Sequence, residues 1–171
     1  QYYRDNRLNP IHEGTEGIHG LDLMGRKLSQ RGGKGYRLFL AAARASIAEA
    51  GTSKQCAGMA AALNDAVGIL DQVSSDLLQQ VAADVDLGLA NATAYLDLFG
   101  RVVVGWIWLR QALVAERALE AGAEGSEADF YQGKLHAARY FMDWELASLA
   151  CQARLLSTGN RLTYDMQDAW F

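Results

Sequence analysis

The stretch SKQCAGMAAALNDAVGILDQVSSDLLQQVAA, residues 53–83, decides the fold. Its apolar and small side chains recur at spacings of three and four residues, which puts them on one face of an α-helix. One row of that face is Cys56, Leu63, Leu70 and Leu77, and the other is Ala60, Val67, Ser74 and Val81. A double row of this kind buries one stripe against a partner helix. The segment therefore predicts a long helix in a bundle.

The composition of the whole chain favours helices as well. Among 171 residues there is a single proline, Pro10, and 50% of the residues are hydrophobic. Proline breaks helices and alanine favours them, so an alanine-rich chain with one proline is predicted to be all-α. A chain of this length can form one domain with its own core.

Further helices are expected on both sides of residues 53–83. They cover approximately residues 16–28, 36–50, 87–121 and 127–157. Ser126 is predicted to be the N-cap of the last of them. Between residues 95 and 109 the only charges are Asp97 and Arg101, which are spaced to pair on one helix face. A helix so apolar belongs in the centre of a bundle. The predicted architecture is all-α, an antiparallel bundle of four to five helices.

Tryptophan side chains are predicted to anchor the core or an interface. These are Trp106, Trp108, Trp144 and Trp170. The tail, residues 159–171, ends in the aromatic pair Trp170-Phe171. Aromatic residues at such a position usually dock, either onto the bundle or onto a partner chain.

Charge and hydropathy exclude two classes of partner. The net charge of −4 is mild, and the basic residues are interpreted as scattered among acidic ones. A nucleic-acid binder usually shows a basic stripe, so no nucleic-acid partner is predicted. The most apolar run, residues 102–109, is bounded by Arg101 and Arg110. Eight residues cannot cross a bilayer, so no membrane span is predicted.

The two cysteines, Cys56 and Cys151, each lie in an apolar helical pattern and are predicted to be buried thiols rather than a disulfide or metal ligands. The histidines have no metal-ligand spacing with one another or with the cysteines, so no metal site is predicted. This cysteine usage does not point to an oxidising compartment, so a cytoplasmic location is predicted. The polar opening, residues 1–5, has no signal peptide and no initiating Met, which predicts a piece of a longer protein.

Three neighbouring motifs carry a family resemblance. They are YRDNR at residues 3–7, IHEGTEGI at residues 11–18 and LDLMGRKL at residues 21–28. The segment resembles the surroundings of the catalytic base in acyl-CoA dehydrogenases, which read Tyr-Arg-Asp-x-Arg, Ile-Tyr-Glu-Gly-Thr and Gly-Arg-x-Leu. The remainder, with YLDLFG at residues 95–100 and VVVGWIW at residues 102–108, is similar to an additional C-terminal helical domain in one bacterial branch of that family. That branch includes enzymes acting on methylthiopropionyl-CoA.

The resemblance implies a role for each residue of the central motif. Glu13 is the base that takes an α-proton from an acyl-CoA, Gly14 lies against the substrate, and Thr15, Glu16 and Gly17 contact FAD. A carboxylate suits this task if an apolar site raises its pKa. Thr15 also offers a hydroxyl and an amide at a helix start, where a phosphate or ribose can bind.

The resemblance also implies partners and a domain boundary. In the full-length enzyme the partners are the acyl-CoA substrate, electron-transferring flavoprotein and a second subunit, because family members assemble through their C-terminal helical domains. Residues 1–30 are expected to end the catalytic helical domain, and residues 31–171 to form the additional domain. The parts of the family that supply most FAD contacts are absent from the chain, so it is expected to be inactive alone.

Two departures and two alternatives stand beside this interpretation. His12 occupies the place of a common Tyr, which affects polarity next to the base, and Gly17 occupies the place of a Gln that reaches the adenosine of the cofactor. Without its flanking motifs, Glu13 would be interpreted as a solvated loop glutamate. The alternative for the whole chain is a stand-alone helical interaction or dimerisation module with no catalysis.

Overall fold

The computed structural model of the chain describes residues 4–5 and 14–170. Helices are the only regular secondary structure in these residues. The prediction of an all-α fold is therefore confirmed.

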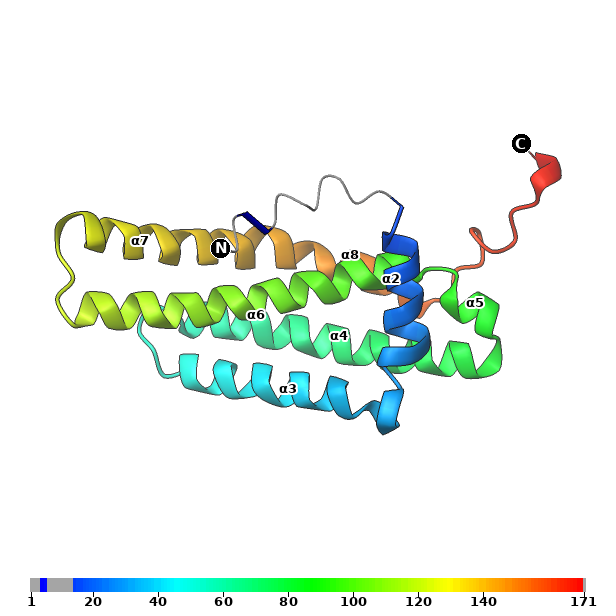
Figure 1. Cartoon of the computed structure of the whole chain (residues 1–171), viewed down its shortest axis with the longest axis horizontal. Helices are drawn as coiled ribbons and strands as arrows, with labels where there is room; N and C mark the ends of the chain where they lie inside the picture. The colour runs from blue at the N-terminus through cyan, green and yellow to red at the C-terminus, as the bar shows by residue number, and fades with distance from the viewer. Residues whose placement is uncertain (1–3, 6–13, 171) are drawn as a thin grey trace.

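Eleven helical segments from residue 16 onward build the described fold. They are α2 (Glu16–Asp22), η2 (Leu23–Lys27), α3 (Gln30–Ala50), α4 (Ala57–Ala83), α5 (Val85–Leu89), α6 (Ala92–Glu120), α7 (Gly125–Tyr140), η3 (Phe141–Glu145), η4 (Leu146–Ser148), α8 (Leu149–Ser157) and η5 (Asp168–Trp170). Figure 1 shows α3, α4, α6 and the consecutive α7 and α8 as long rods side by side, each antiparallel to the next, with α2 crossing them at one end. This is the predicted antiparallel bundle.

The seam that predicts α4 forms the core of the bundle. Every residue of its two rows is buried except Val81, which is half-buried. Ser74, the polar member, is buried because its hydroxyl donates to the Leu70 carbonyl at 2.7 Å and shares a 2.6 Å hydrogen bond with the Tyr95 hydroxyl. The helix begins at Ala57 rather than at Ser53, because the Ser53 hydroxyl accepts from the Cys56 amide at 2.8 Å and so caps the turn that precedes it.

The central position of α6 is confirmed. It contacts α2, α3, α4, α7 and α8, and Arg101 and Asp97 form the predicted ion pair at 3.1 Å. By length and hydropathy α6 could cross a membrane, but its contacts with the helices around it account for its apolar character within the bundle. The predicted helix over residues 87–121 is interrupted between α5 and α6. Within α5, Gly88 packs so closely against α4 that a Cβ on it would lie 2.6 Å from atoms of Val81.

The last predicted helix, residues 127–157, is one long rod with a π-helical turn and a 3-10 turn inside it, η3 and η4. Its apolar stripe faces the core. The buried members are Leu135, Ala138, Met142, Leu149 and Leu156, and the half-buried ones are Tyr131, Glu145 and Gln152. The prediction that Ser126 is the N-cap was wrong, because Glu124 holds that position. The positive φ of Gly122 and Gly125 turns the chain tightly enough for α7 to begin at Gly125, one residue before Ser126.

The two cysteines differ in burial. Cys56 is buried, and burial raises the pKa of its thiol to about 11, so the thiol stays protonated at neutral pH. Cys151 is exposed, and its prediction as a core thiol was wrong. It lies two residues after the buried Leu149, and two residues turn an α-helix by more than half a revolution, so Cys151 points away from the core.

The tryptophans also divide into two groups. Trp106 and Trp108 are partly buried against the core, as predicted for core anchors. Trp144 is 69% exposed and Trp170 is 62% exposed. These two side chains do not anchor the core. Of the two predicted roles, only that of an interface anchor stays a prediction for them.

Gly20 is a position where the fold requires glycine. A Cβ there would lie 2.7 Å from the carbonyl oxygen of Ala92, the first residue of α6. We expect Gly20→Ala to lower the free energy of unfolding by about 1–3 kcal/mol, because overpacking forces the backbones apart. The matched control is Gly68→Ala in α4, an exposed position with open space around a Cβ. It should raise stability by about 0.5–1 kcal/mol. Equal effects in denaturant unfolding would contradict this account of α2.

Glu116 is a buried carboxylate that ties α6 to the start of α4. It accepts hydrogen bonds from the Ser53 hydroxyl and, at 3.0 Å, from the Gln55 amide. Burial works to raise the pKa of Glu116, but these hydrogen bonds outweigh it and hold the pKa below its ordinary value. The carboxylate therefore stabilises the fold at neutral pH.

Replacing Glu116 should remove a pH-dependent part of the stability. A lowered pKa in the folded state contributes stability above the unfolded pKa, about 4.3, and this contribution is lost as the pH falls toward the folded pKa. We expect Glu116→Gln to cost about 1–3 kcal/mol at pH 7. Its unfolding free energy, measured from pH 7 to pH 3, should also fall less steeply than that of the parent chain. Parallel curves would show that Glu116 contributes no such linkage.

Candidate functional site

The residues expected to contact substrate and cofactor lie at the start of α2. Gly14 has φ +70°, a left-handed conformation that glycine adopts freely. Thr15 is the N-cap of α2, and its carbonyl accepts from the His19 amide at 2.9 Å, while its hydroxyl makes no capping hydrogen bond. Glu16 and Gly17 form the first turn. The expected base, Glu13, and its neighbour His12 lie outside the described residues.

Contacts with the bundle fix the position of this segment. Gly20 is buried against the backbone at the start of α6. Met24 in η2 and Leu28, directly after η2, are buried in the core. Figure 1 shows α2 crossing α6 at the end of the bundle where α6 begins. The chain that carries residues 14–17 is therefore attached to a rigid support.

Among the described residues, the surface at residues 14–17 is open. Gly14 and Glu16 are exposed, Thr15 and Gly17 are half-buried, and a Cβ on either glycine would have no described atom within 4 Å. Neither of the two principal cavities of the described structure is lined by these residues. They offer a hydroxyl, amides and a carboxylate along one edge, not an enclosed pocket.

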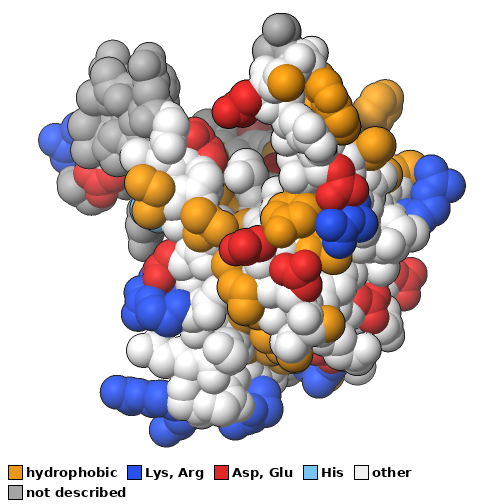
Figure 2. All heavy atoms as spheres, turned by 90° about the vertical axis from the view of Figure 1, so that its right-hand side faces the viewer, with side chains coloured by type: hydrophobic (Ala, Val, Ile, Leu, Met, Phe, Trp, Pro, Cys, Tyr) orange, Lys and Arg blue, Asp and Glu red, His pale blue; other side chains and the backbone are white. Residues whose placement is uncertain are grey.

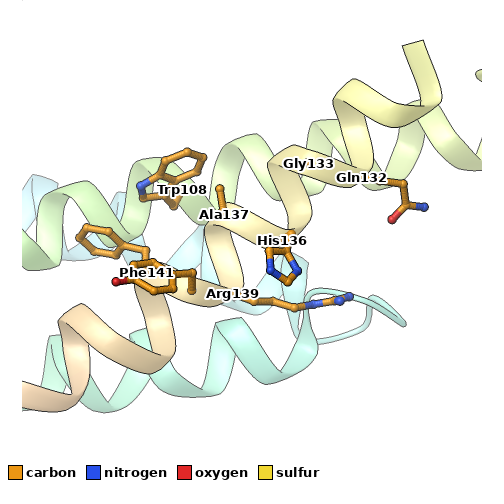
Figure 3. Close-up of a pocket in the computed structure, with 8 residues that line it drawn as sticks. Trp108, Gln132, Gly133, His136, Ala137, Arg139 and Phe141 are labelled. Atoms are coloured by element: carbon orange, nitrogen blue, oxygen red, sulfur yellow. The ribbon is translucent and has the colours of Figure 1, made fainter. Parts of the chain in front are cut away.

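The larger cavity is a groove of about 670 Å³ along α7, which we call the α7 groove. It is lined by Trp108, Gln132, Gly133, His136, Ala137, Arg139, Tyr140 and Phe141. Figure 3 shows it extending from the Trp108 and Phe141 rings at one end to Gln132 at the other. Arg139 donates to the Gln55 side chain at 3.2 Å, and His136 is exposed. The lining therefore combines aromatic rings with the polar side chains of Gln132, His136 and Arg139, and it contains no carboxylate.

The smaller cavity, about 320 Å³, lies where η2 meets α3 and α6, and we call it the α3 pocket. Its lining is Leu23, Lys27, Leu28, Gln30, Gly35, Tyr36, Phe39 and Phe99. The segment around it, residues 26–37, contains five basic residues and no acidic one. The interpretation of the basic residues as scattered among acidic ones was therefore wrong here. A charge count over twelve-residue windows would have found this cluster.

Metal chemistry has no support in the described part of the chain. No group of three or more His, Cys, Asp or Glu side chains in residues 4–5 and 14–170 could hold an ion. The prediction that no metal is bound stays a prediction.

Comparison with known proteins defines the class of the chain. The family described as "Acetyl-CoA dehydrogenase C-terminal like" matches residues 39–167. A 3-methylmercaptopropionyl-CoA dehydrogenase from Ruegeria pomeroyi is 32% identical over 166 residues, which cover 95% of this chain and 27% of that protein. A broad-specificity linear acyl-CoA dehydrogenase from Mycobacterium tuberculosis is 31% identical over 182 residues, 100% of this chain and 29% of that protein. A butyryl-CoA dehydrogenase from Syntrophomonas wolfei is 27% identical over 140 residues, 81% of this chain and 23% of that protein.

The chain therefore belongs to the acyl-CoA dehydrogenase family and corresponds to the C-terminal part of its members. The resemblance found in the sequence is confirmed at this level. The chain spans between a quarter and a third of the length of the Ruegeria and Mycobacterium proteins.

Proposed function

We propose that the chain is the C-terminal part of a flavin-dependent enzyme that oxidises an acyl-CoA to the trans-2-enoyl-CoA. The observation that carries the proposal is the Glu13-Gly14-Thr15 motif, with its flanking motifs in register, in a chain that belongs to the acyl-CoA dehydrogenase family. The names of the relatives support an acyl-CoA substrate class.

The proposed reaction assigns one step to this chain. Glu13 takes the proton from the α-carbon of the thioester, and the electron pair of that C–H bond forms the new carbon–carbon double bond. The hydrogen on the β-carbon leaves with its electron pair, and FAD supplies the acceptor for that hydride. A carboxylate performs the proton transfer at neutral pH when its surroundings raise its pKa.

Residues 14–17 fit one edge of a flavin and substrate site. The left-handed Gly14 leaves its surroundings open for the substrate. The Thr15 hydroxyl is not used for capping, and Gly17 has open space beside it. Thr15, Glu16 and Gly17 would contact FAD from this edge, and the remaining contacts would come from a longer protein.

The same proposal covers organisation and partners. Residues 1–30 would end the catalytic helical domain, and residues 31–171, which contain the matched span 39–167, would form the additional helical domain. Electron-transferring flavoprotein would reoxidise the flavin. A cytoplasmic location and self-association through the helical domain complete the proposal.

The 171-residue chain alone is expected to lack activity. Because residues 14–17 form an open edge, we expect the purified chain to retain no flavin and to oxidise no acyl-CoA. Equilibrium dialysis with FAD, followed by absorbance of the retained protein, tests the first point. Stoichiometric flavin on the isolated chain would contradict the proposed division of the site.

A stand-alone interaction module is the second candidate. The exposure of Trp144 and Trp170 favours it, because large exposed aromatic side chains mark docking sites. The two candidates differ in the reading frame that encodes them. An acyl-CoA dehydrogenase requires several hundred further residues, on the order of two or more domains, upstream of Gln1, whereas a module requires none.

A further inference from the structure

The tail after α8 presents apolar side chains that the described chain does not cover. Every residue from 161 to 170 is exposed, and these include Leu162, Tyr164, Met166 and Trp170. Figure 1 shows the tail leaving the bundle at the end where α2 crosses, and in Figure 2 it rises from that end with apolar side chains on its surface. Burying such side chains is favourable in water, so a covering surface is needed.

The base of the tail is fixed, and its distal half can reach outward. The Asn91 side chain donates to the Asn160 carbonyl and accepts from the Thr163 hydroxyl, both at 3.3 Å. Beyond this anchor the seven residues from Tyr164 to Trp170 span at most about 25 Å when extended. The tail leads away from its own bundle (Figure 1), so its distal half can meet a neighbouring molecule.

The α3 pocket has the chemistry to receive this tail. Three half-buried rings, Tyr36, Phe39 and Phe99, line it, with ring centroids 5.2–6.5 Å apart. A fourth ring can join such a cluster edge-to-face or offset. The pocket volume of about 320 Å³ is within the range of cavities that hold small ligands.

Charge distinguishes this pocket from the α7 groove. Lys27 lines the pocket, and Arg26, Arg31, Lys34 and Arg37 are its sequence neighbours. Arg26 and Lys27 pair with Asp22, whereas Arg31 and Lys34 form no ion pair within the described part of the chain. The tail after Arg161 has two acidic residues and no basic one; Asp165 pairs with Arg161 at 2.9 Å, and Asp168 forms no ion pair with the described residues. Figure 2 shows Lys and Arg side chains gathered along the lower edge of the end that the tail leaves from above.

We propose that the tail of a second copy docks into the α3 pocket, with Trp170 against the Tyr36, Phe39 and Phe99 rings and Asp168 facing Arg31 and Lys34. The tail leaves the bundle at the end where η2 and the start of α3, which line the pocket, also lie (Figure 1). A two-fold axis at that end therefore brings each tail to the other pocket and forms the contact twice. This inference rests on the self-association proposed above and supplies its surface.

Sedimentation equilibrium of the whole chain at micromolar concentrations tests the interface. We expect a dimer whose dissociation constant rises at least about tenfold in Trp170→Ala, since central aromatic anchors dominate such interfaces. The matched control is Phe130→Ala, an exposed aromatic side chain on α7 outside the tail, which should leave the constant within about twofold. Both variants change exposed side chains and should fold as the parent does, which circular dichroism checks.

Charge reversal gives a second, independent readout. Arg31→Glu with Lys34→Glu should weaken the dimer, and so should Asp168→Lys. All three changes in one chain should restore the dimer, because the charges are again opposite across the interface. A restored dimer would support the docking, because a nonspecific loss of apolar contact can weaken association but cannot restore it.

The possible failures separate this inference from the proposed self-association. A parent chain that stays monomeric overturns both. A dimer unaffected by Trp170→Ala or by charge reversal keeps self-association and overturns the tail docking, as does equal weakening by Phe130→Ala. A Trp170 whose fluorescence already indicates burial in the dilute monomer shows that the tail folds back onto its own chain, which also overturns the proposal.

Discussion

In the longer enzyme, Glu13→Gln is expected to retain flavin and bind acyl-CoA while turnover falls by roughly 10²–10⁴-fold, the range for a positioned general base. The amide keeps the shape of the side chain, so binding is preserved. It cannot take up an α-proton at neutral pH, so the reaction stops at the step that Glu13 performs. Steady-state turnover and acyl-CoA titration, both on the purified enzyme, separate the two effects.

The matched control for this substitution is Glu120→Gln, an exposed glutamate at the end of α6. The same loss of charge there should leave turnover unchanged within about twofold, because surface substitutions have small effects. If Glu13→Gln turned over as fast as Glu120→Gln, Glu13 would be a solvated loop residue. The base would then have to be another group of the enzyme.

The second large effect is expected in the core. Leu70 lies in the middle of the α4 seam with 0% of its side chain exposed. Leu70→Ala should lower the free energy of unfolding by about 2–5 kcal/mol, through lost transfer energy and the cavity left behind. Urea unfolding of the 171-residue chain measures this loss and also shows whether the chain folds alone.

Leu38→Ala is the control for that measurement. Leu38 lies in α3 and is 61% exposed, so the same deletion there removes little buried surface. Its unfolding free energy should stay within about 0.5 kcal/mol of the parent value. Equal losses at the two positions would contradict the seam as the centre of the bundle.

Much of the fold follows from periodicity in the sequence. The rows at spacings of three and four in α4 and in the last rod are buried because such spacings keep one face toward the core. The apolar run around Asp97 and Arg101 similarly indicated a central helix. These features are local to one helix, so sequence alone is enough to find them.

Other features depend on contacts between helices and could not be predicted. The buried hydroxyl of Ser74 bonds the Leu70 carbonyl of its own helix, but its second partner is Tyr95, which reaches it from α6. From the sequence, Glu116 would be expected to be exposed; its burial depends on the Ser53 hydroxyl, which donates to its carboxylate in the folded chain. Cys151 was misplaced because an apolar neighbourhood does not say which side of a helix faces outward.

The candidate site divides in the same way. The three motifs within residues 3–28, together with the helical remainder, indicated the family, which the comparisons confirm. The central motif contains every proposed site residue. The roles of Glu13, Gly14, Thr15, Glu16 and Gly17 stay predictions. The α3 pocket was missed, because its lining comes from η2, α3 and α6, which are separated in the sequence.

The reductive half-reaction of the longer enzyme tests the central claim most directly. The absorbance of oxidised flavin is followed in a stopped-flow instrument after mixing with one equivalent of a straight-chain acyl-CoA in the absence of oxygen. We predict rapid loss of that absorbance in the parent, and a rate lower by roughly 10²–10⁴-fold in Glu13→Gln with flavin still bound. No flavin reduction in the parent, or equal rates in the two proteins, would contradict the account.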